Sequence, residues 1–157
     1  MKFLLPFLLC LVTFGASAQQ APLPVPPPPA IAAKSWVLYD FQAGQIVVAQ
    51  NPNERIEPAS LTKMMTAYLT YEAIKQKRIT PDQVVPVSPR AWKAEGSRMF
   101  IEPRRTVSVD ELLRGMIVQS GNDASIALAE LIAGSEPAFG EKMNQEAARL
   151  GLANTHF

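Results

Sequence analysis

The sequence predicts a mixed α/β fold in which an antiparallel sheet packs against helices. Three observations lead to this prediction. Two β-rich runs around residue 40 are separated by a short connection, and four later segments show helical spacing or helix caps. In addition, 48% of the 157 residues are apolar, which is enough for the chain to fold around a core.

The first 18 residues have the pattern of a secretory signal peptide. Lys2 supplies a positive start, an apolar run follows, and Ala16–Ala18 supplies a small-residue cleavage site. The apolar run is too short for a transmembrane helix. A lipoprotein signal at Cys10 is the alternative, but "FLLC" lacks the small residues expected before a lipidated cysteine. We therefore expect an exported protein, in the periplasm or at the outer face of the cytoplasmic membrane.

Cleavage of this peptide would leave a chain of balanced charge. It would remove the only cysteine and one basic residue, leaving 14 basic and 14 acidic residues. Such a balance argues against nucleic-acid binding, because proteins of that class present a basic surface. A chain without cysteine has no disulfide or thiolate chemistry, and no cluster of His, Asp and Glu has metal-ligand spacing. We expect no metal and no cofactor.

A proline-rich leader, residues 19–32, follows the predicted signal peptide. Six prolines between Pro22 and Pro29 favour a polyproline II backbone and remove hydrogen-bond donors. We interpret the segment as a disordered or semi-rigid leader. Recognition by a proline-binding domain is the alternative.

The first regular element is a predicted β-hairpin that pairs Ser35–Asp40 with Gln45–Gln50. Both runs are rich in β-branched or aromatic residues, and Gly44 can adopt the positive φ that a tight connection needs. A lone hairpin is only marginally stable in water. Because this is the one clear strand pair beside four helices, we expect the sequence to be a fragment whose further strands lie beyond residue 157.

The first predicted helix runs from Ser60 to about Lys75, with apolar residues near helical spacing. Residues 76–107 are predicted to be irregular, with short extended pieces and one helical turn, because prolines forbid long elements there. A second helix opens at Ser108, which has Glu111 in capping-box spacing.

Two further helices complete the prediction. The segment 124–134 is nearly all apolar, so we expect a helix that is buried on all sides. The last helix should begin after the N-cap Ser135 and stop at Gly151.

Ser60 and Lys63 form the first candidate site. Residues three apart share one face of a helix, so these side chains can come within hydrogen-bond range. A serine hydroxyl becomes a nucleophile when a base takes its proton. Lysine can be that base once burial or nearby cations lower its pKa from about 10.4. Structurally, Ser60 could instead cap the helix and Lys63 could be solvated, although a cation is mildly unfavourable in the first turn.

A second polar motif, "QSGNDA", interrupts the helical region. Its turn can direct the Ser120 hydroxyl and the Asn122 amide into a cleft, and an amide that both donates and accepts suits a peptide backbone. In the structural alternative, Gly121 ends one helix and Asn122 or Asp123 caps the next. The only histidine is His156 and no Gly-x-Ser-x-Gly motif occurs, so a histidine triad is not predicted.

The two motifs occur in the order and separation of a known family. Ser-x-x-Lys at residues 60–63, followed about sixty residues later by Ser-x-Asn at 120–122, resembles the penicillin-recognising serine enzymes. The blocks "EPASLTKMMTAYL", "EGSRMFIEP", "TVSVDELLRGMIVQSGNDASIALAE" and "ARLGLANTHF" are similar to low-molecular-weight penicillin-binding proteins, the D-alanyl-D-alanine carboxypeptidases. The resemblance covers residues 33–157 and implies the N-terminal part of a β-lactamase/transpeptidase-like catalytic domain.

The resemblance implies a role for each motif residue. Ser60 would be the acylated nucleophile, with its backbone N–H as half of the oxyanion hole, and Lys63 would be its base. Ser120 would relay a proton to the leaving D-alanine, and Asn122 would hold the peptide amide of the substrate. The implied partners are peptidoglycan stem peptides ending in D-Ala-D-Ala and the β-lactam antibiotics that mimic them. No metal or organic cofactor is implied.

The sequence also departs from the family. It lacks the Lys-Thr-Gly motif, the second domain and the C-terminal amphipathic anchor, so we expect little turnover from these residues alone and membrane association only through an anchor not present here. Three alternatives stay open. A DD-endopeptidase would share the motifs, a class A β-lactamase typically has Asp at the position of Gly121, and a non-catalytic peptidoglycan-binding module requires a protonated, solvated Lys63.

Overall fold

The structure is a computed structural model that describes residues 26–157. The predicted signal peptide, residues 1–18, and the start of the proline-rich leader lie outside the described residues. Residues 26–34 form neither helix nor strand and are exposed. The chain divides into two compact units, one up to Arg55 and one from Ile56 onward, and each is described by itself. None of the helices in the described part of the chain is long and apolar enough to cross a membrane.

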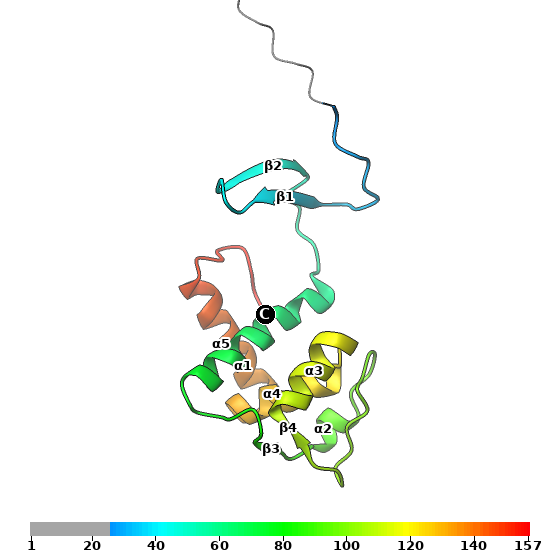
Figure 1. The fold of residues 1–157 in the computed structure, drawn as a ribbon, viewed down its shortest axis with the longest axis vertical. Helices are drawn as coiled ribbons and strands as arrows, with labels where there is room; N and C mark the ends of the chain where they lie inside the picture. The colour runs from blue at the N-terminus through cyan, green and yellow to red at the C-terminus, as the bar shows by residue number, and fades with distance from the viewer. Residues whose placement is uncertain (1–25) are drawn as a thin grey trace, which may run out of the picture. The chain divides into compact units, whose positions relative to one another are not determined.

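The first unit contains the predicted hairpin (Figure 1). Strands β1 (Trp36–Asp40) and β2 (Gln45–Gln50) pair in antiparallel orientation. In the connecting turn, Asp40 Oδ1 accepts hydrogen bonds of 2.9 Å from two backbone N–H groups. Gly44 has a φ of 67°, the left-handed value that its position was expected to need. The hairpin prediction is confirmed to within one residue.

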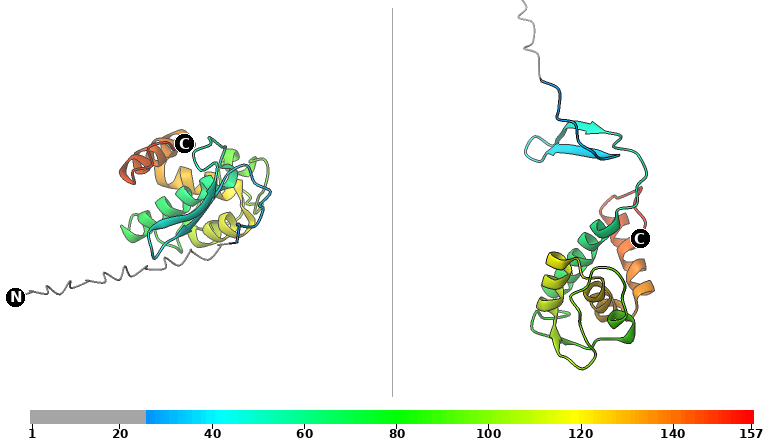
Figure 2. Two further views of the ribbon diagram at one scale, coloured as in Figure 1. Left: turned by 90° about the horizontal axis from the view of Figure 1, so that it is seen from above. Right: turned by 90° about the vertical axis from the view of Figure 1, so that its right-hand side faces the viewer.

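The second unit combines helices with a short strand pair (Figures 1 and 2). Strands β3 (Val84–Val85) and β4 (Val107–Ser108) are antiparallel and only two residues long, which is too short to leave a periodic signal in the sequence. In chain order the elements are a 3-10 turn η1 (Ala59–Thr62), α1 (Lys63–Lys75), β3 (Val84–Val85), α2 (Pro89–Trp92), β4 (Val107–Ser108), α3 (Val109–Gln119), α4 (Asn122–Ala133) and α5 (Glu136–Arg149).

The first helix begins differently from the prediction. Ser60 lies in the 3-10 turn η1, and the α-helix starts only at Lys63. The cap positions of η1 and α1 are Pro58 and Thr62, so Ser60 is not a helix cap. In a 3-10 turn the side chains at i and i+3 eclipse one another. The tighter turn therefore aligns Ser60 with Lys63 more directly than an α-helix would.

Three other helix ends agree with the sequence, whereas α4 begins at Asn122, two residues before the predicted segment 124–134. The Ser108 hydroxyl accepts from the N–H of Glu111, and the Glu111 carboxylate accepts from the N–H of Ser108, which completes the predicted capping box. Ser135 caps α5 by accepting a hydrogen bond of 3.3 Å from the N–H of Ala138. Gly151 has a φ of 74° just after α5, as a C-terminal stop requires.

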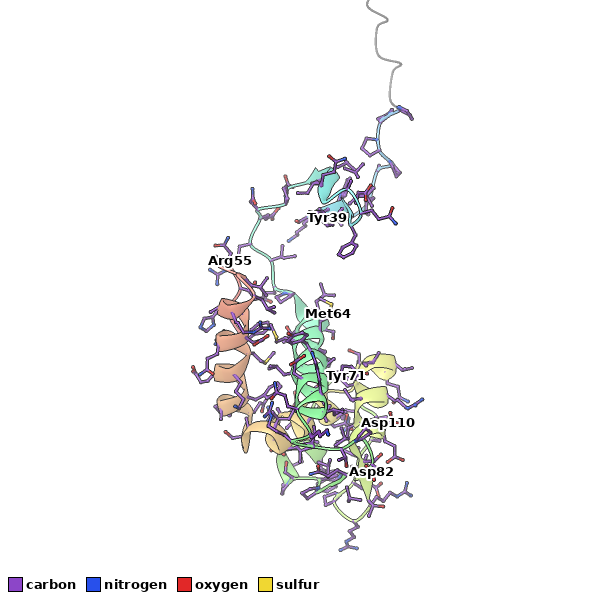
Figure 3. All side chains as sticks on the ribbon, turned by 60° about the vertical axis from the view of Figure 1, so that its left-hand side comes forward. Tyr39, Arg55, Met64, Tyr71, Asp82 and Asp110 are labelled. Carbon is purple, nitrogen blue, oxygen red and sulfur yellow. The ribbon has the colours of Figure 1, made fainter. Side chains whose placement is uncertain are left out.

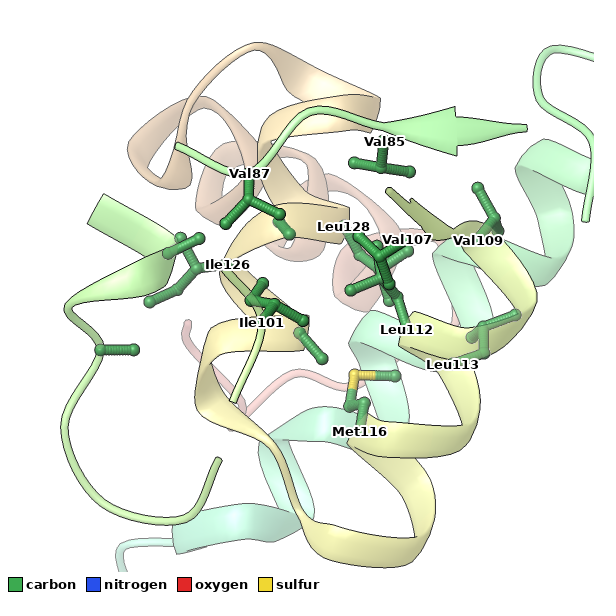
Figure 4. Packing of buried hydrophobic residues seen from close by; sticks show 14 of the residues in the cluster. Val85, Val87, Ile101, Val107, Val109, Leu112, Leu113, Met116, Ile126 and Leu128 are labelled. Atoms are coloured by element: carbon green, nitrogen blue, oxygen red, sulfur yellow. The ribbon is translucent and has the colours of Figure 1, made fainter. Parts of the chain in front are cut away.

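The main core of the second unit lies between α1, α3, α4 and the strand pair. Leu112, Met116 and Leu128 are fully buried and pack with Val85 and Val107 (Figure 4). Every residue of α4 is buried or half-buried, as its nearly all-apolar sequence predicted. A second buried cluster, formed by Met65, Ala129, Phe139, Met143 and Ala147, joins α1, α4 and α5.

Candidate active site

The candidate site lies where the start of α1 meets the junction of α3 and α4. Helix α1 packs against both α3 and α4, and the label on Met64 in Figure 3 marks the relevant end of α1. This packing brings residues 60 and 63 next to residues 120 and 122. All four side chains that the motifs singled out therefore meet at one place in the second unit.

The Ser60 hydroxyl contacts two of the other three side chains. Lys63 Nζ donates to Ser60 Oγ at 3.3 Å, and Ser120 Oγ donates to the same oxygen at 3.0 Å. Ser60 itself is exposed, so a substrate can reach its hydroxyl. An accessible oxygen with an amine on one side and a hydroxyl on the other has the arrangement that a serine nucleophile needs.

Lys63 is half-buried and bridges the two motifs. Besides its contact with Ser60, its Nζ donates a hydrogen bond of 2.7 Å to Asn122 Oδ1. Desolvation by burial lowers the pKa of Lys63. None of the ion pairs among the described residues includes Lys63, so no carboxylate there opposes this effect. Burial thus shifts the balance toward the neutral amine, which is the form that can accept a proton.

The α3–α4 junction directs the second hydroxyl. Ser120 ends α3 in a left-handed conformation, with a φ of 56°, and the N–H of Gly121 returns to the carbonyl of Gly115 at 3.1 Å. Gly121, rather than Asn122 or Asp123, occupies the N-cap position of α4. The cap residues named in the structural alternative are therefore wrong, because Ser120 is the C-cap of α3 and Gly121 is the N-cap of α4.

Asn122 is held on both sides by hydrogen bonds. Its backbone N–H donates to the carbonyl of Ser97 and its Nδ2 donates to the carbonyl of Glu95, both at 2.7 Å. Its Oδ1 is left facing Lys63 Nζ. A Cβ atom on Gly96, which lies between the two carbonyl residues, would be 2.8 Å from Asn122 Nδ2. The amide is thus fixed by a backbone segment that passes very close to it.

Sequence reasoning missed this supporting segment. Residues 95–101 contribute backbone groups rather than side-chain chemistry, and no side-chain motif can reveal such a contribution. The one signal was Gly96, whose φ of 79° allows the close approach to Asn122. A second missed residue is Asp123, considered from the sequence only as a helix cap.

Two hollows border the candidate site. One has a volume of about 700 Å³ and is lined in part by Lys63, Asn122 and Phe139. The other has a volume of about 480 Å³ and is lined in part by Ser60, Ser120 and Met116. In the described part of the chain, no three His, Cys, Asp or Glu side chains are grouped to hold a metal ion.

Known proteins are similar to this chain over most of its length. The D-alanyl-D-alanine carboxypeptidase family matches residues 20–157. The chain is 47% identical over 149 residues to the D-alanyl-D-alanine carboxypeptidase DacD of Escherichia coli K12, a match that covers 91% of this chain and 38% of DacD. The chain therefore spans well under half the length of this relative.

Solved structures agree in fold. Penicillin-binding protein 5 from Haemophilus influenzae matches with a TM-score of 0.79 and 46% identity, over 85% of this chain and 40% of that one. Penicillin-binding protein D2 from Listeria monocytogenes, in its ampicillin-bound form, matches with a TM-score of 0.71 and 28% identity, over 80% and 50%.

These structural neighbours have the transpeptidase/β-lactamase-like fold, so the predicted fold class is confirmed. The family match, which includes both polar motifs, also confirms the resemblance drawn from the sequence. The chain belongs to the D-alanyl-D-alanine carboxypeptidase family of penicillin-binding proteins.

Proposed function

We propose that the protein is a serine-type D-Ala-D-Ala carboxypeptidase that removes the terminal D-alanine of peptidoglycan stem peptides. The observation that carries the proposal is the position of Ser60 Oγ, within hydrogen-bond distance of both Lys63 Nζ and Ser120 Oγ. This geometry occurs in a chain whose family is defined by that activity.

In the proposed acylation step, neutral Lys63 accepts the proton of the Ser60 hydroxyl. The oxygen then attacks the carbonyl carbon of the penultimate D-alanine, and the charge that develops on the carbonyl oxygen is stabilised in part by the backbone N–H of Ser60. Ser120 relays the proton held by Lys63 to the amine of the terminal D-alanine as the peptide bond breaks, so both side chains return to their starting protonation states. Water later hydrolyses the ester on Ser60 and releases the shortened peptide.

Asn122 is proposed to bind the substrate beside these groups. A side-chain amide can pair with a peptide bond, because it offers both a donor and an acceptor. In the unliganded site Oδ1 accepts from Lys63 and Nδ2 donates to Glu95. Substrate binding would use the second N–H of Nδ2 or a free lone pair of Oδ1.

β-Lactams are proposed to acylate Ser60 as mimics of the D-Ala-D-Ala terminus. The Listeria neighbour, solved in an ampicillin-bound form, supports this part of the proposal. The non-catalytic alternative required Lys63 to be solvated, whereas Lys63 is half-buried and desolvation lowers its pKa.

A fluorescent penicillin tests the nucleophile in the full-length protein. We expect covalent labelling that survives denaturation and that disappears in Ser60→Ala. Ser125→Ala is the matched control, since Ser125 donates to the carbonyl of Gly121 and does not contact Ser60 among its hydrogen bonds. Labelling that persists in Ser60→Ala would remove Ser60 from the mechanism.

Product analysis separates the catalytic alternatives. A carboxypeptidase releases free D-alanine from a stem pentapeptide, which mass spectrometry detects as loss of one residue. An endopeptidase instead cleaves cross-linked dimers, and a β-lactamase releases hydrolysed penicillin rapidly rather than retaining it. Loss of D-alanine that requires Ser60 is the result we expect.

We also propose that the protein is exported and acts in the periplasm or at the outer face of the cytoplasmic membrane. The signal-peptide pattern in residues 1–18 supports this location, and peptidoglycan is the substrate class that such a location provides. Cell fractionation and N-terminal sequencing test it. We expect a mature chain that begins at Gln19, and a chain that starts at Met1 in the cytoplasm would contradict the proposal.

A further inference from the structure

We propose that Asp123 is a positioning residue for the reaction. In this proposal its carboxylate fixes the backbone of Met99–Ile101 on the first turn of α4, and the same segment then holds the Asn122 amide against Lys63. This inference rests on the proposed function, because it assigns Asp123 a role in the acylation of Ser60.

Asp123 is only 1% exposed, and its carboxylate is surrounded by backbone donors. The N–H groups of Met99 and Ala124 donate to Oδ1 at 3.0 and 2.9 Å. Those of Phe100 and Ile101 donate to Oδ2 at 2.8 and 3.1 Å. Three successive N–H groups of one segment therefore converge on a single buried carboxylate, as they do in backbone nests that bind anions.

The shape of this segment depends on the carboxylate. Phe100 has a left-handed φ of 64° although it is not glycine, and 70% of its surface is exposed, so burial of its side chain does not explain the conformation. The left-handed residue is what turns the N–H groups of Phe100 and Ile101 toward the same oxygen. We infer that the hydrogen bonds to Asp123 maintain this unfavourable backbone.

The segment continues directly to the catalytic amide. A few residues before Met99, the carbonyls of Ser97 and Glu95 accept from the backbone and side chain of Asn122. Asn122 in turn contacts Lys63. Asp123 and Asn122 are neighbours on α4, so they hold opposite ends of one short segment and fix its position between them.

Close packing leaves little freedom in this arrangement. A Cβ atom on Gly121 would be 3.0 Å from Asp123 Oδ1 and 3.3 Å from the backbone nitrogen of Met99. The junction that aims Ser120 at Ser60 thus lies directly against the carboxylate and the segment it holds.

Asp123→Asn is the sharpest test, because it changes the chemistry and almost none of the volume. Each carboxylate oxygen accepts two N–H groups, so an NH₂ group at either position would face two donors and leave them unpaired. The rate of acylation by a fluorescent penicillin in the full-length protein should fall about 10- to 100-fold. A rate equal to wild type would overturn the proposal.

Asp110→Asn is the matched control. Asp110 pairs with Arg114 on α3, its side chain is 50% exposed, and it lies at the end of α3 remote from Ser120 (Figure 3). The same chemical change there should leave the acylation rate unchanged. Circular dichroism and thermal unfolding of both variants check that the protein is folded at the assay temperature.

A double-mutant cycle distinguishes positioning from a general loss of structure. If Asp123 acts through Asn122, then Asp123→Asn should slow acylation in the wild-type background but have little further effect in Asn122→Ala. Equal effects in both backgrounds would show that Asp123 does not act through the amide, and would overturn the proposal.

Gly96→Ala keeps the proposal testable even if Asp123→Asn fails to fold. Its added Cβ would press on Asn122 Nδ2, and its φ of 79° disfavours any side chain, so the segment must shift beside the amide while the Asp123 carboxylate itself is kept. The slower acylation that Gly96→Ala causes should also be absent when Asn122 is already replaced by Ala. An effect that persists there would contradict the coupling. In every arm, labelling of the wild type but not of Ser60→Ala shows that Ser60 is the acylated nucleophile, and release of D-alanine by the wild type shows that the proposed function holds, so failure of the positioning role is recognised separately.

Discussion

At the scale of single residues, Ser120 places its hydroxyl beside Ser60 while its backbone adopts an unfavourable left-handed conformation. Its φ of 56° ends α3, and its hydroxyl donates to Ser60 Oγ. We predict that Ser120→Gly will slow acylation about 10²- to 10⁴-fold, because a proton-transfer group is lost. Glycine accepts the left-handed conformation, so the free energy of unfolding should not fall. Stopped-flow labelling and chemical denaturation measure the two effects.

The comparison variant for this prediction is Ser125→Ala, which removes a hydroxyl in the first turn of α4. It should acylate at close to the wild-type rate. A Ser120→Gly protein that reacts as fast as wild type would exclude Ser120 from the proton relay.

The residue-scale site could be predicted only in part from sequence. The contact between Ser60 and Lys63 is local, because one turn of helix is enough to create it. The contacts of these two residues with Ser120 and Asn122 depend on the packing of α1 against α3 and α4. Residue spacing in the sequence cannot predict that packing. That part of the prediction came from the family resemblance. For the hydrogen bonds made by Asp123 and by the backbone carbonyls of residues 95–97, the sequence offered no signal beyond Gly96.

At the scale of elements, the capping box of α3 should contribute measurably to stability. We predict that Ser108→Ala lowers the free energy of unfolding by about 1 kcal/mol, since the N–H of Glu111 loses its acceptor. Arg114→Ala, which removes an exposed ion pair on the same helix, should cost less than about 1 kcal/mol. Urea denaturation compares the two, and an equal or larger loss for Arg114→Ala would contradict this ranking.

Replacing either of two helical glycines by alanine should change the free energy of unfolding, with opposite signs at the two positions. On α3, a Cβ at Gly115 would be 2.9 Å from the Cβ of Met99, so Gly115→Ala should destabilise by about 1 to 3 kcal/mol. On α5, nothing lies within 4 Å of a Cβ at Gly140, so Gly140→Ala should stabilise by about 0.5 to 1 kcal/mol. Denaturation midpoints measure both, and stabilisation by Gly115→Ala would show that Met99 adapts freely.

The elements that sequence predicted well are those with local signals. Caps at Ser108 and Ser135 and the turn at Gly44 depend on neighbouring residues, and the structure confirms all three. The start of α1 was wrong by one turn, because residues 59–62 form a 3-10 turn before the α-helix begins at Lys63. The β3–β4 pair was missed because its partners are short and distant in sequence.

At the scale of the whole molecule, the core between α1, α3 and α4 supports the site. Leu128 is 0% exposed, and we predict that Leu128→Ala lowers the free energy of unfolding by about 2 to 5 kcal/mol. Leu150 at the end of α5 is 45% exposed, so Leu150→Ala should have a much smaller effect. Thermal unfolding tests this difference. A similar loss in the free energy of unfolding in the two variants would mean that the core between α1, α3 and α4 does not dominate stability.

The pH dependence of acylation tests the central claim most directly. Burial lowers the pKa of Lys63, and only the neutral amine can take the Ser60 proton. The rate should therefore rise with pH, with a midpoint below about 10.4, the ordinary pKa of lysine. In Lys63→Arg the side chain stays protonated, so acylation should be about 10²- to 10⁴-fold slower and should not rise in this way. An Lys63→Arg protein that reacts at the wild-type rate, with the same pH profile, would contradict the account.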